Sequence, residues 1–183
     1  MNKKREQRIG IFGTVRSLTT AAMLTAMSVV IGIFCKSLLN FGGGLFRITF
    51  ENLPILMAGI TFGPIVGGVV GAATDIISYF LSGQAYPLNL IVTVGAASIG
   101  VISGLFAKYV FRKSGYPRII FSSVFAHIVG SMIIKPIGLF TFYNWAVLWR
   151  IPLYLVIAPL EIVILCLIYK NASVKKLMEK GLL

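Results

Sequence analysis

Long apolar runs, interrupted by short polar and glycine-containing segments, restrict the folds open to this sequence more than any other feature. The runs cover residues 17–35, 53–64, 66–82, 88–111, 118–137 and 145–169. A helix that crosses the hydrocarbon core of a bilayer needs roughly 20 apolar residues. Charged residues make up only 12% of the chain, against about a quarter in soluble domains. The sequence therefore predicts an all-α integral membrane protein, with a single transmembrane domain over residues 1–183.

Clusters of lysine and arginine indicate how often the chain crosses the membrane. They precede the first run, flank the fourth and fifth, and follow the sixth: Lys3, Lys4, Arg5, Arg8 and Arg16; Lys108, Arg112, Lys113 and Arg118; Lys170, Lys175, Lys176 and Lys180. Such clusters favour the cytoplasmic side. All three lie there if the chain also turns at Gly63 and Pro64, which break a helix. We therefore expect a six-helix bundle with both termini cytoplasmic and with an N-terminus that is not a cleaved signal.

The remaining charged residues gather toward the outer side of this predicted bundle. They are the cations Lys36, Arg47, Lys135 and Arg150 and the acids Glu51 and Asp75, whereas Glu161 is expected deep toward the inner side. Asp75 lies on the order of 10 Å below the outer end of its helix. A carboxylate inside a span costs about 2.5–3.5 kcal/mol and usually faces a partner or a cavity. The pattern predicts a ligand cavity open to the outside, although a cation such as Lys36 can also simply extend to the headgroups.

A polar segment with three consecutive glycines, residues 40–52, separates the first two runs. Glycine permits the backbone angles that a closing loop needs. We expect this segment to form a lid over the cavity, hinged at residues 42–44, with Arg47 bringing charge to the ligand. The alternative is that Asp75 pairs with Arg47 or Lys135 only to hold the loop closed.

Motifs for catalysis, metal binding and nucleotide binding are absent from the sequence. The FGGGLF segment lacks the lysine and serine of a phosphate-binding loop. Cys35 and Cys166 have no metal-ligand spacing. His127 is interpreted as a core histidine, or otherwise as a pocket contact. We expect no enzyme, cofactor or metal, and the basic residues suit a membrane surface better than a nucleic acid.

Small residues recur at four-residue intervals in several runs, which lets helix backbones approach closely in lipid. They include Gly59, Gly63, Gly67 and Gly71, and then Ala96, Gly100 and Gly104. Ala22 and Ala26 have the same spacing in the first run, beside Met23 and Met27. Packing within the bundle explains most of these residues. The alanine pair is also suited to receive a helix of another protein.

Two segments, together with this alanine pair, resemble a known family. The segments are FRITFENLPILMAGITFGPIVGGVVGAATDIISYFL, residues 46–81, and YPLNLIVTVGAASIGVISGLFAKYVFRK, residues 86–113. They are similar to the substrate-binding S components of energy-coupling factor (ECF) vitamin transporters, and most closely to the folate-specific branch. The resemblance implies a six-helix subunit of the bacterial plasma membrane that captures a vitamin at the outer face. It also implies that Ala22 and Ala26 dock a transmembrane coupling protein with two cytosolic ATPases, and that the subunit reorients to deliver the vitamin inward.

Folate would make specific demands on the outer cavity. Its flat pterin needs an acceptor of paired N–H bonds, for which we expect Asp75, assisted by Asn89. Aromatic side chains available for stacking are Phe50, Tyr79, Tyr143 and Trp145. The cations suited to the carboxylates of the glutamate tail are Arg47, Lys135 and Arg150. Tyr143 and Trp145 also fit the aromatic belt of a membrane interface. Glu161 and Lys36 receive no role.

Other functions fit parts of the same pattern. The cargo could be another vitamin or precursor, such as pantothenate, riboflavin or a modified-base precursor. A self-sufficient small permease that oligomerises through the first run is a second alternative, and it would transport without a coupling protein or ATP. A bound pterin in the purified protein would separate the folate hypothesis from both.

Overall fold

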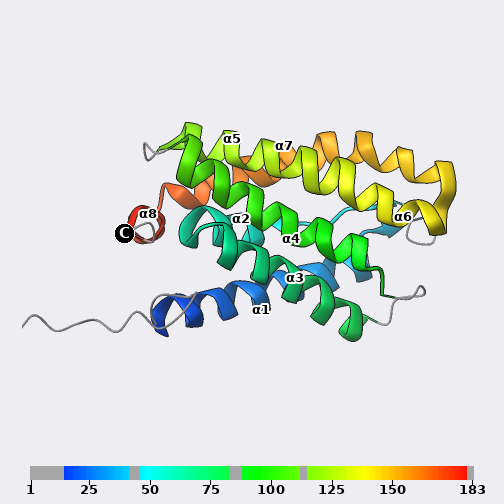
Figure 1. Cartoon of the computed structure of the whole chain (residues 1–183), viewed down its shortest axis with the longest axis horizontal. Helices are drawn as coiled ribbons and strands as arrows, with labels where there is room; N and C mark the ends of the chain where they lie inside the picture. The colour runs from blue at the N-terminus through cyan, green and yellow to red at the C-terminus, as the bar shows by residue number, and fades with distance from the viewer. Residues whose placement is uncertain (1–14, 42–45, 83–87, 112–114, 181–183) are drawn as a thin grey trace, which may run out of the picture.

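Helices make up nearly all of the residues that this computed structural model describes, which are 15–41, 46–82, 88–111 and 115–180 (Figure 1). The elements in chain order are α1 (Val15–Leu38), β1 (Asn40–Phe41), β2 (Phe46–Arg47), α2 (Asn52–Phe62), α3 (Pro64–Ser82), α4 (Leu90–Leu105), η1 (Phe106–Val110), α5 (Tyr116–Ala126), η2 (His127–Ile134), α6 (Lys135–Tyr143), η3 (Asn144–Trp149), α7 (Arg150–Tyr169) and α8 (Ala172–Lys180). Elements η1 and η2 are π-helical, and η3 is a 3-10 helix. The proposed hinge, residues 42–44, lies outside the described residues, and so does the side chain of Arg47.

The expected count of six helices is confirmed once continuous stretches are taken together. Four stretches are long and apolar enough to cross a membrane: Ser17–Leu38, Pro64–Ser82, Leu90–Val110 and Tyr116–Tyr169. The last one contains two antiparallel limbs, because the chain reverses between α6 and α7 (Figure 1). Asn144 lies at this reversal with a φ of 48°, a positive value that is uncommon for residues other than glycine. The sixth helix is α2, which has only 11 residues.

Helix α2 is short and lies inside the bundle. Its sequence is apolar on every side, and a helix of that kind is normally buried. All residues from Asn52 to Thr61 are buried, and only Phe62 is partly exposed. The chain then turns at Gly63, whose φ of 93° favours glycine, and α3 begins at Pro64. Before α2, the short strands β1 and β2 pair antiparallel, so the all-α expectation missed a small hairpin.

Glycines allow α4 to pack directly against the backbones of α2 and α3. A Cβ added to Gly100 would lie 2.0 Å from the carbonyl oxygen of Gly67. One added to Gly59 would lie 2.4 Å from the carbonyl oxygen of Gly100, and one added to Gly104 would lie 2.5 Å from the nitrogen of Pro64. The four-residue spacing therefore marks close packing here, except at Gly63, which serves the turn and faces open space.

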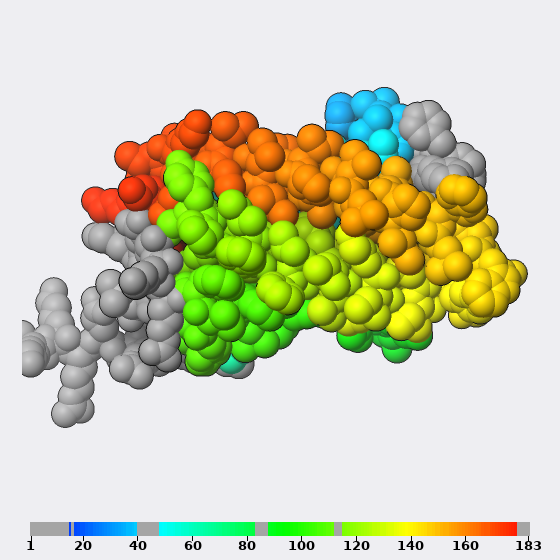
Figure 2. Space-filling view, turned by 90° about the horizontal axis from the view of Figure 1, so that it is seen from above, coloured from blue at the N-terminus to red at the C-terminus, as the bar shows by residue number. Residues whose placement is uncertain are grey.

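Helices α5, η2 and α6 form one continuous stretch whose middle is widened. The backbone N–H of Lys135 donates to the carbonyl of Gly130, five residues back, which is the π-helical pattern. Pro136 follows directly; a proline inside an α-helix has no N–H to donate and clashes with the carbonyl four residues back. Figure 2 shows this stretch lying beside α7 along the length of the molecule, and both α5 and η2 contact α7.

Helix α8 covers one end of the bundle, where Figure 1 shows it end-on. Its apolar residues Val174, Leu177 and Met178 pack against the main core, while Lys175 and Lys176 are exposed. The buried end beneath it contains Arg118, whose Nη2 donates to the carbonyl of Ile60 at 2.7 Å. The carbonyl groups in the last turn of a helix have no N–H partner within the helix. Arg118 therefore supplies the hydrogen-bond donor for one such carbonyl of α2.

Candidate ligand-binding site

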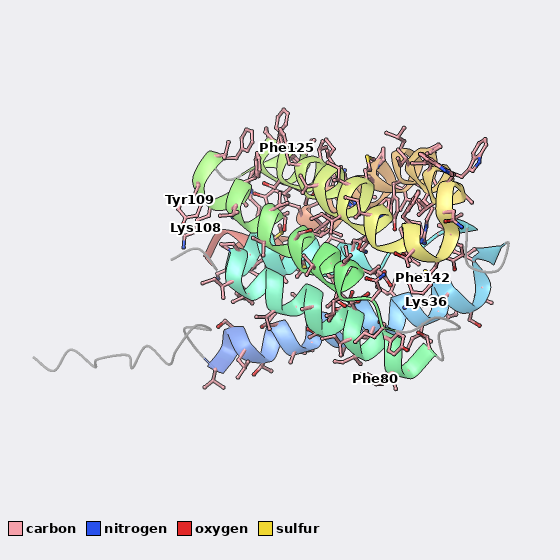
Figure 3. The ribbon with its side chains drawn as sticks, turned by 45° about the vertical axis from the view of Figure 1, so that its right-hand side comes forward. Lys36, Phe80, Lys108, Tyr109, Phe125 and Phe142 are labelled. Atoms are coloured by element: carbon pink, nitrogen blue, oxygen red, sulfur yellow. The ribbon has the colours of Figure 1, made fainter. Side chains whose placement is uncertain are left out.

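Polar and charged side chains from five helices meet in the interior, near the end of the bundle where α1 ends and α6 lies. Figure 3 places Lys36 toward this end, with Lys108 and Tyr109 at the opposite end. Lys36 and Lys108, which the sequence analysis assigned to different sides of the membrane, thus lie at opposite ends of the molecule. The residues that form the cluster are Lys36 of α1, Glu51 and Asn52 at the start of α2, Asp75 and Ser78 of α3, Thr93 of α4 and Lys135 of α6. We call this set the polar cluster.

Glu51 lies between two lysines of the polar cluster. Its Oε2 atom is 3.9 Å from Nζ of Lys36, and its Oε1 atom is 3.8 Å from Nζ of Lys135. The residue is only 7% exposed. It fits because α1 carries Gly32 at this point, where an added Cβ would lie 2.7 Å from Oε2 of Glu51. The backbone carbonyl of Glu51 also accepts a hydrogen bond from the hydroxyl of Ser28 on α1.

Lys135 is buried and bridges two parts of the bundle. Its Nζ atom donates to Oδ1 of Asn52 at 3.1 Å, in addition to its ion pair with Glu51. Its aliphatic stem crosses α4 at Gly95, where an added Cβ would lie 2.7 Å from Cγ of Lys135. A long cationic side chain can cover apolar surface in this way while its charged end reaches polar partners. Lys135 therefore depends on a glycine of α4 for its path into the cluster.

Asp75 completes the cluster from α3. Its Oδ2 atom accepts a hydrogen bond from the hydroxyl of Thr93 at 2.7 Å. The charges of Lys135, Glu51 and Lys36 all act on this carboxylate. Among the described residues, Thr93 is its hydrogen-bond partner, so Oδ1 stays available to a ligand. The sequence analysis gave a direct pairing of Asp75 with Lys135 as an alternative. In the structure, Lys135 pairs with Glu51 and Asn52 instead.

Two buried polar atoms near these charges lack partners within the described part of the chain. They are Nδ2 of Asn52 and Oγ of Ser78. A buried polar group without a hydrogen bond costs free energy, so such atoms call for an explanation. Ser78 lies beside Glu51, because a Cβ added to Gly32 would be 3.6 Å from its Oγ and 2.7 Å from Oε2 of Glu51. Both atoms are therefore buried close to the charged groups of the polar cluster.

The structure brings some of the expected site residues together and leaves others apart. Asp75 and Lys135 belong to the polar cluster. Asn89 instead caps α4 by accepting from the N–H of Ile91, and its Nδ2 donates to the carbonyl of Gly138, so it joins α4 to α6. Phe50 is half-buried beside Glu51, and Tyr79 is half-buried with its ring edge-on to Phe80 at 5.5 Å.

The two residues expected from the reversal between α6 and α7 behave differently. Trp145 is 74% exposed and packs edge-on against Phe140, a position that fits the interfacial belt better than a pocket wall. Arg150 is buried at the start of α7, and its Nε atom has no partner in the region described. The side chain of Arg47 lies outside the described residues, and its backbone pairs with Asn40 in the hairpin.

Sequence reasoning missed Asn52, Ser78 and Thr93, and it assigned Glu51 no contact with ligand. One available signal was the Glu51–Asn52 pair at the start of an otherwise apolar helix. The hydroxyl residues carried no such signal, because serine and threonine are common in membrane helices as packing residues. Their role follows only from the helix arrangement.

Residues 16–178 match the profile of a family described as "ECF transporter, substrate-specific component". Over 101 residues the chain is 33% identical to a Mycoplasma pneumoniae protein described as an uncharacterized MG098 homolog, and over 79 residues it is 33% identical to the folate transporter FolT of Clostridium novyi. These alignments cover 50% and 42% of this chain. They span only 20% and 46% of the two relatives, less than half of either.

Two solved structures are similar in fold. A crystal structure of FolT bound with folic acid superposes with a TM-score of 0.69 over 87% of this chain and 95% of that one, at 20% identity. The structure of the S component of a bacterial ECF transporter superposes with a TM-score of 0.60 over 85% and 94% of the two chains, at 21% identity. At these identities the superpositions establish a shared arrangement of helices.

Proposed function

The chain belongs to the family of substrate-specific components of ECF transporters, and on that premise we propose that its substrate is folate, bound at the polar cluster. The family supplies the role, which is recognition of the transported compound and not catalysis. The polar cluster supplies the site. The similarity to a folate transporter and to a fold solved with folic acid supports the choice of vitamin.

The observation that carries this proposal is a partly buried carboxylate, Asp75, in the same polar cluster as the ion pairs of buried Glu51 with Lys36 and Lys135, inside an apolar bundle. Asp75 offers Oδ1 to a donor edge, with Oδ2 held by Thr93. A pterin presents adjacent N–H donors that such an acceptor can bind. Lys36 and Lys135, which flank Glu51, suit the carboxylates of a glutamate tail. The amide of Asn52 and the hydroxyl of Ser78 add hydrogen-bonding capacity beside them.

The partner surface of this proposal is on α1. Ala22 and Ala26 are exposed there, beside Met23 and Met27, which are 68% and 43% exposed. Small residues at this interval let a second helix approach closely in lipid. We assign this strip to a transmembrane coupling protein that carries two cytosolic ATPases. The polar cluster then opens to the outside of the bacterial plasma membrane, and both termini are cytoplasmic.

The proposal is tested by ligand binding to the purified chain in detergent, measured by calorimetry. We expect one folate per chain, bound at least 100-fold more tightly than riboflavin or pantothenate. Asp75→Asn should weaken folate at least tenfold, because an amide in place of the carboxylate loses one of the paired acceptors. Ser98→Ala is the matched control, since its hydroxyl bonds to Gly95 of its own helix at 2.8 Å. Tight binding of another vitamin, or full affinity in Asp75→Asn, would contradict the proposal.

A further inference from the structure

A row of buried polar residues follows one face of the α5–η2–α6 stretch. Ser123, His127, Ser131 and Lys135 recur at every fourth position, and each is at most 5% exposed. In an α-helix, a row with this spacing would rotate by about 40° per step, or about 120° from Ser123 to Lys135. The π-helical bonding of η2 places more residues in each turn and offsets this rotation. The widened helix therefore keeps the row on one face, with Lys135 at its end in the polar cluster.

The middle of this row contacts a carboxylate of α7. Nε2 of His127 lies 2.9 Å from Oε2 of Glu161, and Nδ1 of His127 lies 3.2 Å from Oγ of Ser131. His127 and Glu161 are 1% and 0% exposed. Among the described residues, neither Nε2 of His127 nor Oε2 of Glu161 has a hydrogen-bond partner. The contact between them is therefore close but poorly aligned for a hydrogen bond. Ionisable residues this deep in a membrane helix are costly and usually serve a function.

The position of this contact relative to η2 gives it a consequence. His127 is the first residue of η2, and Lys135 is the residue directly after it. Pro136 and the Lys135–Gly130 hydrogen bond account for the widening at the far end. The hydrogen bond of His127 to Ser131 and its close contact with Glu161 hold the near end. If η2 relaxed to an α-helix by one residue, Lys135 would turn by about 100° and shift by about 1.5 Å, away from Asn52 and Glu51.

We infer that His127, Ser131 and Glu161 are positioning residues, which hold the π-helical form of η2 and thereby keep the ammonium group of Lys135 in the polar cluster. They touch no ligand themselves. Their effect on binding passes through Lys135, and that part of the inference rests on the proposed function. The placement of Lys135 does not depend on which ligand the cluster binds.

The first experiment therefore needs no ligand. Purified variants are treated briefly with an acetylating reagent, and the modification of each lysine is quantified by mass spectrometry, with exposed Lys108 as the internal reference. In the wild type, buried Lys135 should react slowly. His127→Leu and Glu161→Leu should raise its rate at least tenfold, and Ser131→Ala two- to fivefold. Glu161→Gln, whose side-chain amide keeps the size and the polar contact with the imidazole, should stay within twofold of the wild type. Ser122→Ala, a buried serine of α5 outside the row, is the matched control.

A double-mutant cycle then measures the route to the ligand. Alone, His127→Leu should weaken folate binding at least tenfold. In the Lys135→Gln background, the same substitution should weaken folate binding less than twofold. Equal losses in the two backgrounds, or Lys135 labelling unchanged in both leucine variants and in Ser131→Ala, would overturn the inference. If the labelling follows the expected order but the wild type does not bind folate, the proposed substrate fails and the positioning role stands. If the leucine variants do not fold, the acetylation rates of Lys135 in Ser131→Ala and Glu161→Gln decide: a two- to fivefold rise in the first and no change in the second support the inference.

Discussion

The helices α2, α3 and α4 are held together by glycines, whereas α5, η2, α6 and α7 face each other with buried polar side chains. In the first region the backbones themselves meet, as at Gly67 and Gly100. In the second region, His127, Ser131 and Glu161 lie between the helices, and one helix is widened to accommodate them. Close backbone packing has no freedom to adjust, because a protein interior is already densely packed. The polar region instead offers groups that can exchange partners, which suits ligand binding. The polar cluster lies where the two regions meet.

The comparison predicts the largest effect for a methyl group added to the glycine-packed region. Gly100→Ala places its Cβ against the backbone of Gly67, which cannot move aside. We expect a loss of about 3 kcal/mol in the free energy of unfolding, or no folded protein at all. Gly68→Ala is the matched control, since its Cβ would lie 2.7 Å from a side-chain methyl group of Val101 and no closer than 3.8 Å to the carbonyl oxygen of Ala97. Thermal unfolding followed by size-exclusion chromatography would measure both, and equal stability of the two variants would refute the distinction.

The surface of α1 should affect transport without affecting binding. With leucine at both Ala22 and Ala26, the strip on α1 becomes too bulky for a closely packed partner helix. Uptake of labelled folate by cells that express the coupling proteins should fall more than tenfold, while folate affinity of the purified variant stays within twofold. Val156→Leu, on the exposed side of α7, is the control and should leave uptake unchanged. Loss of affinity in the double variant would show that α1 is not a separate docking surface.

Lys135 should matter for the anionic part of the ligand. Lys135→Gln removes the charge next to Glu51 and keeps a donor for Asn52. Folate affinity should fall about tenfold, because hydrogen bonds to charged groups contribute about 1.5–3 kcal/mol. The affinity for a pterin without the glutamate tail should fall less than twofold. Calorimetry with both compounds tests this, and equal losses would place Lys135 at the pterin and not at the tail.

The smallest effect is expected where the two regions touch. Gly95→Ala adds a methyl group 2.7 Å from Cγ of Lys135 and 3.3 Å from its backbone nitrogen, which is a milder overlap than the 2.0 Å approach to backbone at Gly100. Folate affinity should fall two- to fivefold with little loss of stability, in contrast to Gly100→Ala. In the Lys135→Gln background the same change should have a smaller effect. A loss of stability as large as that of Gly100→Ala would mean that the two regions do not differ as described.

The sequence was sufficient for the helices and for part of the site, because apolar length and local charge are properties of short segments. The turn at Gly63, the six helices and the inward positions of Asp75 and Lys135 follow from such local patterns. The partners of these residues do not. Glu51 meets Lys135 across 84 positions of the chain, and the π-helical turns that bring Lys135 into place depend on contacts with α7. Trp145 shows a further limit of local patterns, since an aromatic residue at a membrane interface has the same local signature whether it faces a cavity or lipid.

Helix α2 is attached at both ends to the same neighbouring stretch. Lys135 binds Asn52 at its first residue, and Arg118 binds the carbonyl of Ile60 in its last turn. These anchor points are eight residues apart on α2, or about 12 Å. Sliding of α2 along its axis would have to break both attachments, so the short helix and the long one form a single mechanical unit. Movements that admit or release a substrate must then take place at the other faces of this unit.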